Sequence, residues 1–197
     1  PLDGLHPDGN PWQEETIIFM NIADSINFNM SCNFHTGAEV FNYPWDTWSN
    51  IAADDNWWKH VSREYADSCQ TNSGNGYFEW SNWNNQSANG VVNGYDWYSI
   101  DGGRQDYMNY FRSCRELTLE LSNDKTPNPN DLPELWDANY PSLLNYMEQA
   151  LQNNELANLK FKDSKYATGR RKTSIAKVWL KKGSGIITVS YTHLTLP

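Results

Sequence analysis

Two residues of the chain combine reactive side chains with positions in predicted strands, and the first is His35. His35 follows residues 28–34, which we predict to be a strand, and Gly37 marks a flexible turn after it. In open α/β sheets ligand sites lie at the carboxyl ends of strands, so His35 is a candidate metal ligand. The alternative is a hydrogen-bonded structural histidine. A catalytic zinc needs three protein ligands, which one histidine does not supply.

Glu120, the second, lies in a predicted strand over residues 116–121, whose letters ELTLEL alternate between polar and apolar types. The alternation places Glu116, Thr118 and Glu120 on one face. A carboxylate on a buried strand must be paired, solvated in a cleft or shifted in pKa. Two interpretations stay open: an edge strand with a wet face, or a general base in a pocket.

Two His–Glu pairs with a spacing of four residues also suggest metal binding. His60 and Glu64 lie on a predicted helix, where a surface charge pair worth about 0.3–0.5 kcal/mol is the expected role. His35 and Glu39 follow a strand end and have no second histidine nearby. Neither pair makes a zinc site by itself.

The elements that must position these residues alternate between helix and strand. We predict helices over residues 14–25, 54–69, 105–111 and 132–151, and strands over residues 28–34, 97–100 and 116–121. Residues 71–94 are rich in Asn, Ser and Gly and are expected to form a long loop. The last helix carries a clear apolar stripe, made of Trp136, Tyr140, Leu143, Leu144, Met147 and Leu151. The alternation predicts an α/β domain with a mixed sheet flanked by helices.

The charge is divided unevenly along the chain. Residues 1–159 hold 6 Lys or Arg and 23 Asp or Glu, a net charge of −17, whereas residues 160–182 hold nine and one, a net charge of +8. Such an asymmetry of charge indicates a domain boundary near residue 160. We predict a linker at 152–165 and an appended basic β-hairpin, with strands at 172–182 and 186–190 around a turn at 183–185.

Three cysteines, Cys32, Cys69 and Cys114, are compatible with one disulfide plus a free thiol or with three buried thiols. No C-x-x-C pair indicates a thiolate metal site. No apolar run approaches the roughly 18–20 residues of a membrane span, and no signal peptide is recognisable. We expect no membrane partner.

Three stretches in one order resemble the zinc metallocarboxypeptidases, specifically their carboxypeptidase D/E/N-like branch with its bacterial secreted members. The family's third zinc-ligand motif is resembled by residues 33–48, NFHTGAEVFNYPWDTW. Its specificity-loop segment is resembled by residues 93–110, NGYDWYSIDGGRQDYMNY. Its catalytic-glutamate strand is resembled by residues 114–122, CRELTLELS. The resemblance covers about residues 1–151 and implies the carboxyl-terminal half of the catalytic domain. It implies a secreted or periplasmic parent enzyme that acts on peptide or protein C-termini.

The resemblance also implies roles for particular residues. His35 would be the third zinc ligand, and Glu120 the general base and acid. Tyr98 would be the mobile tyrosine that closes over the substrate's terminal residue. Asp46 and Gln105 would line the pocket for its last side chain, where an acid favours Lys or Arg. A turn-capping role for Asp46 is the alternative.

Some of the family's motifs do not occur in the chain. There is no H-x-x-E motif, which supplies the first two zinc ligands, and the Asn-Arg pair that binds the substrate carboxylate lies upstream in the family. We therefore expect a truncated part of the enzyme that binds zinc weakly and hydrolyses nothing alone.

The basic tail has a different resemblance. Residues 166–189, YATGRRKTSIAKVWLKKGSGIITV, resemble the opening hairpin of the bacterial small-subunit ribosomal protein S-nine, which implies rRNA as a partner if the segment functions. Residues 190–197 resemble translated sequencing-adaptor read-through, so a chimera is expected. Two rival functions follow: a structural rRNA-binding protein, or a non-catalytic carbohydrate- or peptide-binding module.

Overall fold

The computed structural model describes residues 6, 8–73, 76–79, 89–161, 164–171 and 174–181, with side chains described up to residue 151. The chain divides into two compact units, residues 1–146 and 147–197. The candidate site residues all fall in the first unit. The predicted limits of the domains, including the linker at 152–165, stay a prediction.

The first unit is built on a mixed sheet whose strand order is β1-β4-β2-β3. The strands are β1 (Met30–His35), β2 (Ala38–Tyr43), β3 (Val91–Asn93) and β4 (Arg115–Ser122). β1 runs parallel to β4, β4 antiparallel to β2, and β2 parallel to β3. β4 is therefore an inner strand, which excludes the edge-strand interpretation of Glu120.

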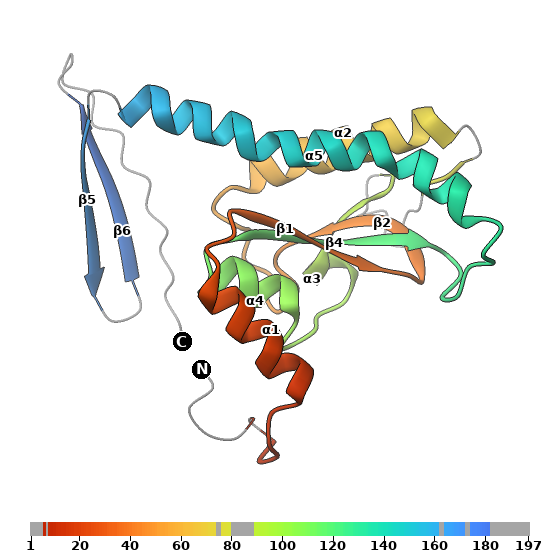
Figure 1. Ribbon diagram of the computed structural model, residues 1–197, viewed down its shortest axis with the longest axis horizontal. Helices are drawn as coiled ribbons and strands as arrows, with labels where there is room; N and C mark the ends of the chain where they lie inside the picture. Colours follow the sequence, from red (N-terminus) through yellow and green to blue (C-terminus); the bar gives the residue numbers. More distant parts are fainter. Residues whose placement is uncertain are drawn as a thin grey trace. The chain divides into compact units, whose positions relative to one another are not determined.

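Helices cover both faces of this sheet (Figure 1). One face carries α2 (Asp55–Ser73) and the first part of α5 (Leu132–Phe161); the other carries α1 (Glu14–Ser25), α3 (Gly94–Trp97) and α4 (Arg104–Phe111). The main core lies under α2 and α5, where Trp58 and Tyr65 pack against Phe41 and Leu119. The predicted α/β fold with a helix-flanked mixed sheet is confirmed.

Two details of the predicted strands are wrong. No strand is predicted at residues 38–43, yet β2 lies there and is almost wholly buried. Both of its faces are covered, so its letters AEVFNY lack the polar–apolar alternation of a half-exposed strand. The strand predicted at 97–100 is absent, and the short helix α3 ends at Trp97 instead. The strand that completes the sheet beside β2 is β3.

Most of the apolar stripe of α5 does not face the core; of its six residues, Leu143 alone packs against it. Trp136, Tyr140, Leu144, Met147 and Leu151 are each more than 40% exposed. The buried side of the helix instead carries small and polar residues, namely Ala138, Asn139, Ser142 and Gln149, together with Tyr146. α5 also continues through Pro141 and ends at Phe161 rather than near residue 151.

In the second unit, an antiparallel hairpin joins β5 (Ser164–Arg171) to β6 (Ser174–Lys181). The strand predicted at 172–182 is largely present as β6. Among the described residues β6 pairs with β5, which lies upstream, with Arg171 opposite Ser174; the partner strand predicted at 186–190 lies outside the described residues. Residues 182–197 lie outside the described residues, including the predicted turn at 183–185.

The three cysteines Cys32, Cys69 and Cys114 are free thiols. This decides between the two open alternatives in favour of unpaired thiols. No helix within the described residues is long and apolar enough to cross a membrane.

Candidate functional site

One face of the sheet gathers the polar side chains of β1 and β4. The parallel register pairs Ser31 with Glu116, Asn33 with Thr118 and His35 with Glu120, so these six residues share one face, as the alternation in β4 predicted. α1, α3 and α4 lie over this face (Figure 1). Glu39 lies on β2 next to Val40, which pairs with Glu120, so alternation turns Glu39 to the opposite face.

His35 and Glu120 contact each other at the carboxyl end of β1. His35 Nδ1 lies 2.8 Å from Glu120 Oε1 and 2.9 Å from Oε2. The two side chains differ in accessibility: that of His35 is 61% exposed and that of Glu120 only 7%. A nearly buried carboxylate beside an accessible imidazole is suited to hold and transfer a proton at the surface of a cleft.

The described residues do not assemble a zinc site. No group of three His, Cys, Asp or Glu comes together among them in a way that could hold a metal ion. His35 is the single predicted ligand present, and a zinc site needs three. We therefore derive no chemical step through zinc. His60 pairs with Glu64 along α2, at 3.6 Å, as the surface charge pair that its spacing predicted.

Glu116 is the second carboxylate on this face, and it is fully buried. Arg104 Nε lies 2.8 Å from its Oε1, Arg104 Nη2 donates to Oε2 at 3.1 Å, and the Ser31 hydroxyl donates to Oε2 at 2.5 Å. Burial raises the pKa of Glu116, while Ser31 and Arg104 act in the opposite direction. Glu116 is thus a structural carboxylate, four residues from the candidate base.

Asp46 lies in the loop after β2 and is 3% exposed. Its Oδ1 accepts hydrogen bonds from Gln105 Nε2 at 3.1 Å and from Asn42 Nδ2 at 3.3 Å. Burial and the neighbouring charge of Asp106 raise the pKa of Asp46 to about 7, against a weaker lowering by Asn42. Asn42, Asp46 and Gln105 together form what we call the Asp46 cluster.

The Asp46 cluster contains two buried oxygens that accept no hydrogen bond. They are Asn42 Oδ1 and Gln105 Oε1. Such orphaned acceptors are rare in folded proteins, and each costs about 1–3 kcal/mol until a donor reaches it. The cluster therefore gathers a group of buried acceptors, one of them an ionisable carboxylate, whose chemistry suits a ligand with several N–H donors.

Tyr98 follows α3 and is 54% exposed. Partial burial raises the pKa of Tyr98, and the charges of Glu120 and Asp46 in its neighbourhood raise it further. The backbone just after Tyr98 is hydrogen-bonded to the Asp46 loop, because Ile100 N donates to Asp46 O at 3.2 Å. The structure thus brings Tyr98 near both the base and the Asp46 cluster.

Three contributors to the site were missed by the sequence analysis. Asn42 completes the Asp46 cluster, and Asp106 accepts hydrogen bonds from the backbone N–H groups of Asp46 and Thr47. Gly94 leaves room for the cluster, because a Cβ there would overlap Asp46 Oδ1 and lie 2.9 Å from Asn42 Oδ1. The Asn-Gly dipeptide at 93–94 was the signal available in the sequence.

Comparison with known proteins identifies the family. The model of the zinc carboxypeptidase family matches residues 4–142, which is more than half of the chain. The chain belongs to the zinc carboxypeptidase family. Its relatives include carboxypeptidase D of Drosophila melanogaster and carboxypeptidase M of Mus musculus, each 36% identical to it over 70% of its length. The carboxypeptidase N catalytic chain of Homo sapiens is 32% identical over 71%.

The chain spans only part of these relatives. It covers 10% of the Drosophila protein, and 32% of the mouse and 32% of the human protein. The match confirms the resemblance of residues 33–122 to the carboxypeptidase D/E/N-like branch. The resemblance of residues 166–189 to a ribosomal protein lies outside the matched region and stays a prediction.

Proposed function

We propose that this chain carries the general base and the side-chain recognition cluster of a carboxypeptidase that releases Lys or Arg from peptide C-termini. The observation that supports it most is the Asp46 cluster, with its two orphaned buried oxygens beside an ionisable carboxylate. A Lys ammonium offers three N–H donors and an Arg guanidinium five, which matches this set of acceptors.

The neighbouring residues take roles that fit this reaction. Glu120, as the nearly buried carboxylate, takes a proton from the attacking water and returns it to the leaving amine. Tyr98, which is exposed and close to both carboxylates, closes over the terminal residue. His35 is the one ligand that the described residues contribute to the family's zinc. Hydrolysis requires further ligands, so we propose that the chain alone is inactive.

The proposal is tested by binding rather than by turnover. Two peptides that end in arginine or citrulline have nearly the same shape, but only arginine carries a positive charge. At pH 8, above the pKa of Asp46, we expect the arginine peptide to bind roughly tenfold tighter in an NMR titration. Asp46→Asn should remove this preference. Equal affinities for both peptides in the wild type would count against a basic-residue pocket.

Two glycine substitutions provide a matched control. Gly94→Ala should abolish binding of both peptides, because its Cβ enters the space of Asp46 and Asn42. Gly103→Ala should leave binding nearly unchanged, because its Cβ meets nothing closer than 3.5 Å. Loss of binding in both variants would show that the loop, and not the cluster, was disturbed.

A further inference from the structure

A separate cavity lies on the far side of the loop that carries Asp46. Its volume is about 610 Å³, within the range of small-molecule sites. Seven of its sixteen lining residues are Trp, Tyr or Phe, and they come from α1 and the residues before it, from α4 and from the loop after β2. His35, Glu120 and Tyr98 do not line it, so it is distinct from the candidate catalytic site.

Three aromatic rings form one end of the cavity. The ring centroids of Trp45 and Trp48 are 5.9 Å apart, and each lies 6.3 Å from the centroid of Tyr110. The planes of every pair are inclined by 68° to 82°. Aromatic faces carry negative partial charge, and rings set at steep angles to one another attract organic ammonium ions.

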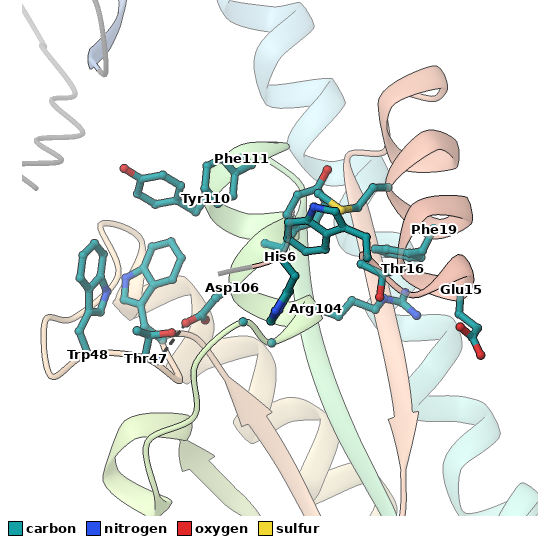
Figure 2. A pocket seen from close by; sticks show the side chains of 16 residues that line it. His6, Glu15, Thr16, Phe19, Thr47, Trp48, Arg104, Asp106, Tyr110 and Phe111 are labelled. Carbon is teal, nitrogen blue, oxygen red and sulfur yellow. Dashed lines mark hydrogen bonds between the residues drawn. The ribbon is translucent and has the colours of Figure 1, made fainter. Parts of the chain in front are cut away.

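The charged residues of the lining favour a cation as well. Figure 2 shows Asp106 between the Trp48–Tyr110 end and the opposite end, where Phe19 and Glu15 lie. Among the described residues, Arg104 is the one Lys or Arg that lines the cavity. It is paired with Glu116, and its guanidinium carbon lies 4.4 Å from the centroid of the Phe19 ring. The charge of Arg104 is thus compensated by Glu116, whereas Asp106 and Glu15 give the lining of the cavity a negative charge.

Other ligand classes fit less well. An anion would meet the charges of Asp106 and Glu15 without an uncompensated lining cation. A neutral sugar stacks on aromatic rings but also needs polar partners for its hydroxyl groups. Both Asp106 oxygens already accept backbone N–H groups of the Asp46 loop, at 2.9 to 3.2 Å, and Arg104 is engaged with Glu116.

We propose that this cavity binds a small organic ammonium ion. The ammonium group lies against Trp45, Trp48 and Tyr110, near Asp106, and the apolar body of the ligand extends toward Phe19. Asn42, Asp46 and Gln105 are not among the residues that line this cavity, so the inference does not depend on the proposed function.

The test compares two probes of the same shape on the full chain by isothermal titration calorimetry. Choline carries a quaternary ammonium group, and 3,3-dimethyl-1-butanol replaces it with a neutral tert-butyl group. We expect choline to bind about tenfold tighter. Equal affinities, tighter binding of the alcohol or tighter binding of methyl glucoside would overturn the proposal, as would no binding of choline at millimolar concentration.

Variants and NMR locate the site. Trp48→Leu should weaken choline binding about tenfold, whereas the same change at Trp136, exposed on α5, should not alter it. If Trp48→Leu fails to fold, the wild type still decides. Choline should then shift the indole N–H signals of Trp45 and Trp48 and leave that of Trp136 in place. Shifts at Trp136 alone would overturn the assignment to this cavity.

Discussion

Asp106 holds the backbone of Asp46 in place while its charge opposes ionisation of the Asp46 side chain. The Asp106 carboxylate accepts the N–H of Asp46 at 3.1 Å and that of Thr47 at 2.9 Å. Burial, followed by the charge of Asp106, raises the pKa of Asp46 to about 7. The charge of the Asp46 cluster therefore changes near neutral pH.

This shift predicts a pH dependence of stability. The pKa of Asp46 is 3.8 as the ordinary value and about 7 in the fold, so between these values the unfolded chain releases a proton that the folded chain keeps. The Asp46 contribution to the free energy of unfolding therefore falls as pH rises from about 4 to 7, by up to roughly 4 kcal/mol, and is constant above that.

Asp46→Asn isolates this effect, because asparagine keeps an oxygen acceptor but does not titrate. In urea unfolding, we expect the variant to gain stability relative to the wild type as pH rises from 4 to 8. A difference between the two proteins that does not change over this range would contradict the assignment.

A second prediction concerns the buried ion pair between Glu116 and Arg104. Glu116→Ala leaves Arg104 and the Ser31 hydroxyl without their partner. We expect a loss of about 2–4 kcal/mol in the free energy of unfolding, somewhat moderated because Arg104 is 38% exposed. Replacing Arg104 by Met in the same variant should restore part of the loss.

The surface pair of Lys59 and Asp55 provides the control for this measurement. Its atoms lie 2.8 Å apart, but Lys59 is largely exposed, so Lys59→Ala should cost no more than about 0.5 kcal/mol. Similar losses in Glu116→Ala and Lys59→Ala would mean that the buried pair does not stabilise the fold.

The exposed stripe of α5 gives a third prediction. Trp136→Ser and Leu144→Ser should each change the free energy of unfolding by no more than about 1 kcal/mol, since both side chains are largely exposed. Tyr146→Ala should cost about 3–5 kcal/mol, because the buried ring packs in the core and its one hydroxyl proton lies between two acceptors, Ser31 O and Arg115 O. Large losses at Trp136 and Leu144 would place the stripe in the core instead.

Zinc binding gives a fourth prediction. With His35 as the one ligand of the family's site among the described residues, the chain should retain less than one zinc per molecule after dialysis, and His35→Ala should not lower that amount measurably. His60→Ala serves as the control from the surface pair. One tightly bound zinc per chain, lost in His35→Ala but kept in His60→Ala, would show that the site is complete.

The pairing of His35 with Glu120 was within reach of the sequence because each signal was local. The letters of β4 alternate, and His35 stands at the end of a predicted strand, two residues before a glycine. The resemblance to the zinc metallocarboxypeptidases then predicted that the strands carrying His35 and Glu120 belong to one site. What the pattern could not provide was their register, which depends on contacts between segments 85 residues apart. The predicted roles of Asp46, Gln105 and Tyr98 likewise stay predictions, although the structure brings these residues together.

The orientation of α5 shows why hydropathy failed elsewhere. Its buried side is held by polar contacts: Tyr65 donates to Asn139 Oδ1 at 2.9 Å, Asn139 Nδ2 donates to the Tyr77 hydroxyl at 2.6 Å, and Ser142 donates to Tyr65 O at 3.1 Å. Polar residues that satisfy one another can be buried at low cost. A prediction from apolar periodicity therefore selects the wrong side of such a helix.

The ion pair of Arg104 with Glu116 has a consequence for how β4 is placed. A strand that slips by two residues keeps every side chain on its own face, so polar–apolar alternation does not resist such an error. A slip of this size would set Thr118 or Ser122 opposite His35 in place of Glu120. Arg104 can meet the Glu116 carboxylate in one register only. The buried pair thus sets the register of β4 against β1, and with it the position of the Glu120 carboxylate opposite His35.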